Sequence, residues 1–406
     1  MRKPVSLSAA EAAERLGVKL DTIYAYVSRG LLTRMPGPDK ESRFELEQVE
    51  RLALRGRRSA QPKPEGWVIV TELTEATPDA VRYRGKSALE LAANLPFERV
   101  AEWLWAVPAE SASSFVAPKA GVALARSVQS ALPEDAPPLE RLRVIASVLG
   151  STDPLRFDTS PGPVVAGARG LIAGLIEALP RTAAKPATKH VDESLAARLY
   201  AQLTAARPIA ARLHVLDVAM GLCADHALSP STLAVRIAAA QRADLYGVVQ
   251  TGLGALSGAL HGAASLSAEE LIAEVEAGAD PAQVIGARLR RGERIPGFGH
   301  TLHVRADPRA QALLELLAIT FERSRALDAA QQVAEVMAAR GLPAPNIDWA
   351  LAVFVRAAGM LHGASEAIMA VARVAGWIAH ALEEYRSPTK FPSQALYVGP
   401  IAGGRP

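Results

Sequence analysis

IPGFGHTLHVRADPRA, residues 295–310, is the stretch that decides how this chain is interpreted. Its first part is too rich in glycine for a core helix and favours a loop, with His300 at the end of that loop. Asp307 then has the character of a helix N-cap, followed by a proline at the first helical position and Arg309 in the first turn. The stretch therefore predicts an imidazole and a guanidinium on the two sides of a junction between a loop and a helix.

Two further histidines lie at predicted breaks between helices. His226 occurs in CADHALSPST (223–232), where a serine N-cap and a proline predict that a new helix starts directly after it. His261 occurs in GALHGAAS (258–265), between glycines that let the backbone approach a ligand closely. Both imidazoles are therefore candidates for a site.

A carboxylate stands at a fourth predicted break. In PNIDW (345–349), Asn346 can cap a helix whose first turn contains Asp348. The N-terminus of a helix favours the ionised form of such a carboxylate. Taken alone, each of these residues is more often structural than functional; their combination in one chain favours function.

The remaining histidines and the cysteine are interpreted as structural groups. His300 and His303 are three residues apart, but no further clustered ligand accompanies them, so no metal site is predicted. Cys223, three residues before His226, is interpreted as a small buried residue rather than half of a thiolate pair. The other histidines without a functional interpretation are His190, His214, His362 and His380.

Composition limits the class of protein. The chain has 406 residues, of which 50% are hydrophobic and 21% are charged, which fits a compact protein with a large core and excludes wholesale disorder. A single cysteine excludes a disulfide scaffold and favours a reducing cytoplasm. The first residues lack the apolar core of a secretory signal, and charges interrupt the most apolar stretch, 349–382, so no membrane span is predicted.

Residues 1–58 are predicted to form a separate winged helix-turn-helix module. Ser8 and Glu11 form the capping box of a first helix, and Asp21 can cap a second helix. A hairpin-like segment, 31–44, follows and leads into a short helix. The pattern EAAERLGV, TIYAYVSRGLL and SRFELEQVERL resembles the winged helix-turn-helix of MerR-type regulators and phage excisionases.

The basic charge of the chain is concentrated in this N-terminal part. Residues 1–66 hold 13 Lys and Arg against 9 Asp and Glu, a balance of +4, and the remainder holds 32 against 33, or −1. The excess favours either a polyanionic partner or a solvated basic face. Residues 59–66 are predicted to be a linker. The outward side chains expected to contact DNA are Lys19, Thr22, Tyr24, Ser28, Arg29 and Arg43.

From residue 67 onward the pattern is mostly helical. Only Trp67–Glu75 and Ala80–Arg84 favour strands, and strands do not alternate with helices, which argues against a doubly wound sheet. The GxGxxxG at 252–258 is one residue off the dinucleotide fingerprint and follows no strand, so no nucleotide site is predicted there. The predicted fold class is all-α.

Several blocks carry a resemblance to a known family: YRGKSALELAANLPFERVAEWLW, LCADHALSPSTLAVR, GALHGAAS, IPGFGHTLHVRADPRA, NIDWA, AVARVAGWIAHALEE and ALYVGP. In this order, over residues 67–406, they resemble the citrate synthase family. The resemblance implies an all-helical fold with a large domain, 67–262 and 361–406, and an inserted small domain, 263–360. It also implies a homodimer whose clefts close on substrate.

The resemblance further implies a role for each candidate. Asp348 would remove a methyl proton from an acyl-CoA thioester while His261 stabilises the enol, because a carboxylate is too weak a base without that stabilisation. His300 would polarise the keto group of a 2-oxoacid such as oxaloacetate. The substrate carboxylates would bind His226, Arg309 and Arg373, and the CoA phosphates would lie near Arg290, Arg291, Arg294 and Arg305. A coenzyme A thioester would be a substrate, with no permanently bound cofactor and no metal.

Four segments depart from the family pattern. The family's DHExN reads DHALS at 225–229, LHGGAN reads LHGAAS at 260–265, and GHRVY reads GHTLH at 299–303. The family's RPRxxYVG, whose first arginine holds a carboxylate in the partner subunit's site, reads FPSQALYVG at 391–399, without an arginine. Loss of such a contact costs on the order of 1.5–3 kcal/mol, so we expect weaker affinity for oxaloacetate or a different acceptor.

Two hypotheses follow for the function. The first is an enzyme that condenses acetyl-CoA, or another short acyl-CoA, with oxaloacetate or a related 2-oxoacid, giving citrate or an analogue and free CoA. Retention of His261, His300 and Asp348 favours it. The second is a DNA-binding transcriptional regulator whose synthase-like body senses an acyl-CoA or a 2-oxoacid with little turnover. A fully degenerate scaffold is a third, which the same three residues disfavour.

Overall fold

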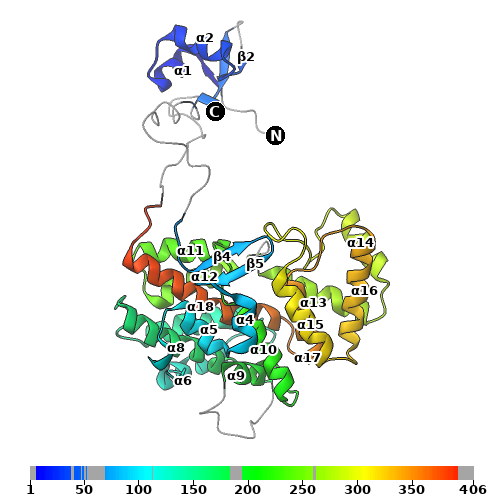
Figure 1. Cartoon of the computed structure of the whole chain (residues 1–406). Helices are drawn as coiled ribbons and strands as arrows, with labels where there is room; N and C mark the ends of the chain where they lie inside the picture. Colours follow the sequence, from blue (N-terminus) through cyan, green and yellow to red (C-terminus); the bar gives the residue numbers. More distant parts are fainter. Residues whose placement is uncertain are drawn as a thin grey trace. The chain divides into compact units, whose positions relative to one another are not determined.

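The chain divides into two compact units, residues 1–70 with 391–406 and residues 71–390 (Figure 1). The computed structural model describes residues 6–37, 41–46, 48–49, 52, 69–111, 113–182, 194–258 and 262–391. Each unit has its own hydrophobic core within these residues.

In the first unit, two short helices pack on a small antiparallel sheet. The elements are β1 (Ser6–Ser8), α1 (Ala9–Leu16), α2 (Leu20–Ser28), β2 (Arg34–Pro36) and β3 (Ser42–Glu45), with the strands in the order β1-β3-β2. The predicted capping box is present, since Ser8 and Glu11 each bond the other's backbone N–H. Ile23 and Phe44 are fully buried between helices and sheet.

The second helix starts differently from the sequence-based expectation. Lys19, not Asp21, occupies the N-cap position, and its side chain makes no capping hydrogen bond. Asp21 lies in the first turn instead, where a carboxylate still favours a helix N-terminus. The turn at 38–40, most of the predicted short helix after Phe44 and the linker 59–66 lie outside the described residues.

A three-stranded antiparallel sheet opens the second unit. Its strands are β4 (Thr74–Thr77), β5 (Ala80–Tyr83) and β6 (Lys86–Ser87), in that order. The first strand begins only at Thr74, so the expected strand over Trp67–Glu75 is wrong for 69–73, while 67 and 68 lie outside the described residues. β5 pairs with the four residues of β4, and upstream of them the Leu73 carbonyl accepts from Arg84 N–H (2.7 Å).

The rest of the second unit is helical. The elements are α4 (Ala88–Asn94), α5 (Phe97–Leu104), η2 (Ala109–Ser111), α6 (Lys119–Gln129), α7 (Pro138–Ser151), α8 (Pro161–Ala178), α9 (Leu195–Leu203), α10 (Ala210–Cys223), α11 (Pro230–Ala240), α12 (Leu245–Leu256), α13 (Ala263–Glu276), α14 (Pro281–Arg290), α15 (Pro308–Thr320), α16 (Arg325–Ala339), α17 (Ile347–Ala358) and α18 (Ala364–Arg386). The prediction of a mostly helical fold is confirmed.

Helix α18 is the centre of the larger core. It contacts α8, α10, α11 and α12, and nearly all its side chains are buried. Trp377 lies directly against Gly252, where an added Cβ would come within 2.7 Å of the indole ring. Gly252 of the GxGxxxG therefore serves helix packing. Helices α13 to α17 gather on one side of the unit in Figure 1.

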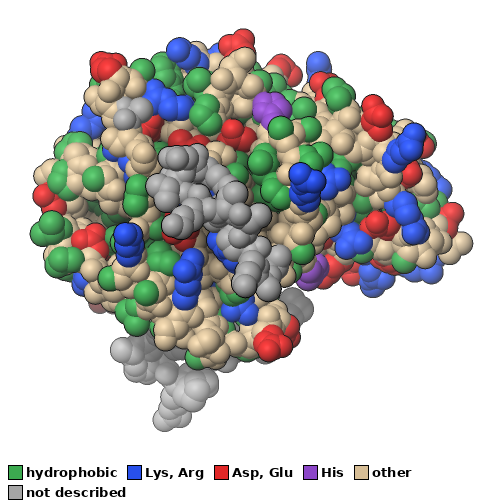
Figure 2. Space-filling view, turned by 90° about the horizontal axis from the view of Figure 1, so that it is seen from below, with side chains coloured by type: hydrophobic (Ala, Val, Ile, Leu, Met, Phe, Trp, Pro, Cys, Tyr) green, Lys and Arg blue, Asp and Glu red, His purple; other side chains and the backbone are tan. Residues whose placement is uncertain are grey.

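The surface of the second unit carries mixed charge. On the face in Figure 2, Lys and Arg side chains are interspersed with Asp and Glu. This agrees with the near-neutral balance of the chain after residue 66. Across the segments that the structure describes, no helix has the length and apolar character needed to cross a membrane.

Candidate active site

The glycine-rich loop at 296–300 is fixed to the start of α17. Gly299 N–H donates to the Ala344 carbonyl (2.8 Å), and Asn346 N–H donates to the Gly297 carbonyl (2.9 Å). Gly297 and Gly299 have φ of +79° and +82°, which disfavours side chains. A Cβ at Gly297 would also lie 2.9 Å from Cβ of Trp349, so the loop closes on α17 only with glycine there.

Asn346 joins the loop to the helix through one side chain. Its Oδ1 accepts from the backbone N–H of Asp348 and Trp349 (3.0 and 3.3 Å), as predicted for an N-cap. Its Nδ2 donates to the Gly299 carbonyl (2.9 Å). Because His300 follows this carbonyl directly, the same amide positions the candidate imidazole and the candidate carboxylate.

Asp307 and Arg309 form a buried ion pair at the start of α15. The guanidinium Nε and Nη2 donate to the two carboxylate oxygens (3.0 and 2.8 Å), and the side chains are 0% and 2% exposed. Burial would raise the pKa of Asp307, but the charge and hydrogen bonds of Arg309 outweigh it and lower the pKa. Asp307 also accepts from Ile347 N–H (3.1 Å), which ties α15 to α17.

Three histidines meet at this junction. The ring centroids of His226, His300 and His303 lie 4.8–5.2 Å apart. His226 Nε2 is 2.9 Å from His303 Nε2, and His303 Nδ1 is 2.9 Å from the Pro78 carbonyl. The contact between the two Nε2 atoms is a hydrogen bond, and the described residues hold no group of three or more His, Cys, Asp or Glu side chains arranged for a metal ion.

His300 is fixed as a hydrogen-bond donor. Its Nδ1 accepts from Leu302 N–H and His303 N–H (3.0 and 3.1 Å), so Nε2 carries the proton of the neutral ring. Burial and then the charge of Arg309 lower the pKa of His300 to about 4. The ring is therefore neutral at pH 7 and offers Nε2–H, which suits a carbonyl oxygen that gains charge during a reaction.

Asp348 is the basic group of the site. Burial raises its pKa to about 6, against the opposing effect of Arg309. No side chain in the described part of the chain donates a hydrogen bond to its carboxylate. A carboxylate with these properties is ionised at pH 7 and is a stronger base than an exposed aspartate.

A second buried carboxyl, Glu366, lies in the first turn of α18. Burial and then the negative charges of Glu269, Glu140 and Asp348 raise its pKa to about 7. Local sequence carries no signal that places Glu366 or His303 at the site. Glu366 stands in the apolar segment 364–372 and His303 in the polar loop before α15, and only the folded chain brings each of them to the junction.

Arg373 and Asp225 extend the site into the core. Arg373, in α18, is 4% exposed, and its Nε donates to the Cys223 carbonyl (2.7 Å) at the end of α10. Cys223 itself is buried, as predicted, and burial raises the pKa of its thiol to about 12. Asp225, beside His226, accepts from Thr74 Oγ1 (2.5 Å) and contacts His380 Nε2 (3.3 Å).

The remaining predicted site residues either lie outside the described part of the chain or are exposed on its surface. His261 and the 392–399 window, where the family arginine is missing, lie outside the described residues. Arg290, Arg294 and Arg305 are exposed on α14 and the loop after it, without a partner in the described chain. Arg291 is also exposed, but it forms two hydrogen bonds with Glu293 (2.5 and 2.8 Å).

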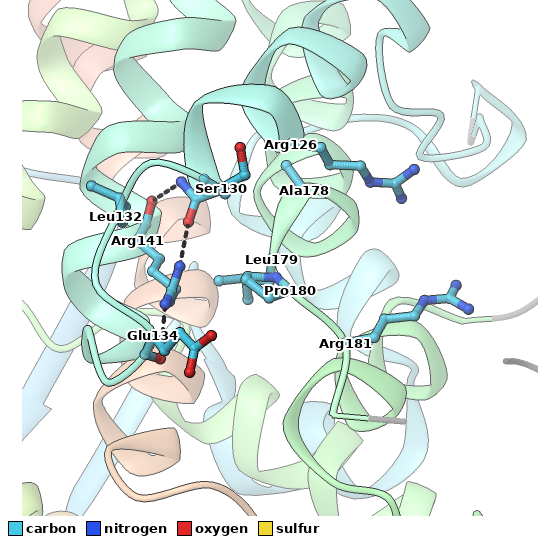
Figure 3. A pocket seen from close by; sticks show the side chains of 10 residues that line it. Arg126, Ser130, Leu132, Glu134, Arg141, Ala178, Leu179, Pro180 and Arg181 are labelled. Atoms are coloured by element: carbon cyan, nitrogen blue, oxygen red, sulfur yellow. Dashed lines mark hydrogen bonds between the residues drawn. The ribbon is translucent and has the colours of Figure 1, made fainter. Parts of the chain in front are cut away.

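A separate cavity of about 750 Å³ lies between the C-terminal ends of α6 and α8 (Figure 3). Arg141 extends into its wall, where it bonds Gln129 Oε1 and backbone carbonyls of 133–136. None of the residues that line this cavity belongs to the junction of loop, histidines and Asp348.

The fold and the junction define a mostly helical enzyme whose site combines a carboxylate base, neutral imidazoles and buried guanidinium groups. These groups come from the turn before α11 (His226), the 296–300 loop (His300), the first turns of α15 (Arg309) and α17 (Asp348), and α18 (Arg373). That combination serves proton removal next to a carbonyl in an anionic substrate.

The chain belongs to the citrate synthase family. The family described as "Citrate synthase, C-terminal domain" matches residues 66–391, and the predicted family is thus confirmed. Citrate synthase 2 of Bacillus subtilis is 28% identical over 353 residues, 83% of this chain and 95% of the relative. The 2-methylcitrate synthase of Mycobacterium tuberculosis is 27% identical over 347 residues, 82% of this chain and 88% of the relative. The protein is a citrate synthase-type transferase.

Solved structures show the same fold. The citrate synthase of Thermotoga maritima superposes with a TM-score of 0.70 at 22% identity, covering 84% of this chain and 96% of that chain. A ternary complex of Thermoplasma acidophilum citrate synthase with carboxymethyl coenzyme A and oxaloacetate superposes with a TM-score of 0.67 at 20% identity, covering 86% and 97%. The alternative of a regulator with little turnover gains no support from these relatives.

Proposed function

We propose that this protein condenses a short acyl-CoA with oxaloacetate and releases CoA and citrate or a close analogue. One observation carries the proposal: Asn346 holds a neutral Nε2–H imidazole and a carboxylate base at one junction. His300 is then the electrophile that activates the keto carbon, and Asp348 is the base that generates the nucleophile.

In this proposal each residue has one task. Asp348 removes a proton from the carbon next to the thioester, and His261 stabilises the resulting enol. The enol carbon attacks the keto carbon, whose oxygen accepts from His300 Nε2–H. His226, Arg309 and Arg373 hold the acceptor's carboxylates, and the buried guanidinium charges of the two arginines are permanent. Water then cleaves the thioester and releases CoA, whose phosphates meet Arg290, Arg291, Arg294 and Arg305.

An assay of CoA release tests which acyl-CoA the protein uses. We expect oxaloacetate-dependent thiol release with acetyl-CoA or propionyl-CoA, because the named relatives are citrate and 2-methylcitrate synthases. Asp348→Asn should abolish the release while oxaloacetate binding survives. A wild-type protein that releases no CoA with any short acyl-CoA, although it binds oxaloacetate, would overturn the proposal.

The division into a large domain, 67–262 with 361–406, and a small domain, 263–360, is part of the same proposal. Helices α13 to α17 group together in Figure 1, which supports it. We also propose a homodimer, with cytoplasmic location. Sedimentation equilibrium tests the dimer, and a mass equal to one 406-residue chain would contradict it.

We also propose a second, separate activity for the first unit, which is DNA binding through a winged helix-turn-helix. Lys19, Tyr24, Ser28 and Arg29 are exposed on and beside α2, with Thr22 partly exposed. Arg43 is less available, because it donates to the Ser6 carbonyl and lies 4.0 Å from Glu11. Binding to the protein's own upstream DNA should weaken steeply with salt. Salt-independent or absent binding would leave this unit as a docking element.

A further inference from the structure

His303 has no role in the reaction described above, yet it is the most constrained imidazole of the three. Its side chain is 2% exposed, and both ring nitrogens are engaged. The Pro78 carbonyl can only accept, so Nδ1 of His303 carries a proton. In the neutral ring Nε2 is then an acceptor, and the proton between the two rings belongs to His226 Nε2.

This arrangement determines what His226 can offer a substrate. Its single proton is directed at His303, so Nδ1 of the neutral ring has a lone pair. None of the described residues bonds this Nδ1, and it is not among the fully buried polar atoms without a partner. A lone pair repels a carboxylate, whereas an N–H would bind it.

We propose that His303 is a positioning residue for acceptor specificity, which makes carboxylate recognition by His226 depend on the uptake of one proton by the His226–His303 pair. With that proton, His226 keeps Nε2–H toward His303 and gains Nδ1–H toward the acceptor. No bond other than N–H changes, and solvent supplies the proton. The inference rests on the proposed function, because it concerns the same acceptor.

The charges around the pair make the uptake conditional. Burial and then Arg309 and Arg373 lower the pKa of His226, and His300 and His303 act in the same direction. Asp307, the nearest acid on α15, is already paired with Arg309. Asp225, next in the chain, bonds Thr74 and His380. His226 is therefore neutral without ligand.

An incoming dicarboxylate changes this balance. Its negative charge favours the charged form of the pair, and the proton enters together with the ligand. A guanidinium binds a carboxylate without taking up a proton, whereas the pair supplies a positive charge only when the acceptor is present. The sequence 391–399 contains no arginine that could supply a permanent charge instead. Acceptor affinity should therefore fall as the pH rises.

The experiment measures protons directly. Oxaloacetate is titrated calorimetrically into the full chain carrying Asp348→Asn, which removes turnover and the titration of that base. Buffers of different ionisation enthalpy give the number of protons taken up at pH 8. We expect about one proton more than in Asp348→Asn/His303→Phe, and a Kd that rises about tenfold per pH unit only with His303 present.

Two further variants separate positioning from a merely structural role. His303→Gln can still accept from His226 Nε2–H through its amide oxygen, so the proton uptake should survive. His226→Asn removes the titrating ring, so oxaloacetate binding should no longer take up a proton. This variant replaces His303→Phe as the test if His303→Phe does not fold. His362→Asn, at a histidine whose side chain is 63% exposed, is the matched control and should change nothing.

Two results would overturn the inference. One is an equal number of protons taken up on oxaloacetate binding by Asp348→Asn and by Asp348→Asn/His303→Phe. The other is no proton uptake by Asp348→Asn although this variant binds oxaloacetate. The proposed function fails separately: proton-linked oxaloacetate binding in a wild-type chain that releases no CoA would retain the inference and remove the reaction.

Discussion

The carboxyl group of Asp348 opposes folding in the ionised state that the reaction needs. Burial raises its pKa to about 6, above the value of about 3.9 in an unfolded chain. Its favourable contribution to stability is present below the unfolded pKa and is lost as the pH rises through 6. At neutral pH the fold therefore holds a destabilising charge at the site.

Asp348→Asn should accordingly lose activity and gain stability. We expect CoA release to fall at least ~100-fold, because the base is gone. At pH 8 the free energy of unfolding should rise by about 1–3 kcal/mol, and the gain should shrink toward pH 4. Thermal melts at both pH values check this. In the wild type, the acid limb of kcat/KM should have its midpoint near pH 6. A variant that is less stable at pH 8 would contradict the argument.

Glu366 gives an independent test of buried carboxyl energetics. Its pKa of about 7 lies above the unfolded value of about 4.3, so the ionisation cost that Glu366→Gln removes begins near the unfolded pKa, grows as the pH rises and is complete above pH 7. We expect the variant to melt higher than the wild type at pH 8.5, by about 1–3 kcal/mol in unfolding free energy, and to match it near pH 4. The exposed Glu335→Gln on α16 is the control. Equal effects at both pH values would show that charge is not the cause.

Residue by residue, the sequence predicts those site members that stand at helix starts. Ser229, Asp307 and Asn346 are N-caps as predicted, because capping depends on neighbours within three residues. The sequence predicts only a structural role for His303, because the groups that it contacts, His226 and the Pro78 carbonyl, are 77 and 225 residues away. Contacts between residues so far apart in the chain cannot be predicted from the local sequence pattern.

At the scale of elements, the side chain of Asn346 contacts both the 296–300 loop and the first turn of α17. The 296–300 loop has no regular secondary structure, and Asn346 connects it to α17 through Nδ2 while Oδ1 caps the helix. Any change there affects the helix start and the position of His300 together. Local pattern predicted the cap but not the bond to Gly299, which is 47 residues away.

Asn346→Ala should therefore cost more activity than its stability loss explains. Removing an N-cap costs about 1 kcal/mol of unfolding free energy. Release of the loop should lower kcat at least ~10-fold in addition, since a misplaced group of about 1 Å has effects of that size or larger. Urea unfolding and steady-state kinetics measure the two parts. Asp280→Ala, which removes the cap of α14, should show the stability loss alone.

Over the whole second unit, a buried polar network connects the first and last described segments. Arg236 in α11 donates to His380 Nδ1 (2.8 Å), Glu383 (2.7 Å) and Glu384 (2.6 Å) of α18. Glu383 accepts from Thr71 and from Glu72 N–H, and Glu384 accepts from Thr389. His380 Nε2 continues the chain to Asp225, beside the site. Helical periodicity predicts α11 and α18 but not this connection.

Arg236→Met tests whether this network holds the unit together. The guanidinium is 3% exposed, and its removal leaves two carboxylates that are at most 10% exposed without their cation. Loss of one partner in a buried pair costs about 3–5 kcal/mol. Because the remaining carboxylates can take up protons in acid, denaturant unfolding should show a larger loss at pH 8 than at pH 5. Arg143→Met, in a half-exposed pair with Glu140, should cost under about 1 kcal/mol. Similar small losses in both variants would mean that hydrophobic packing around α18, rather than the network, holds the two ends of the unit.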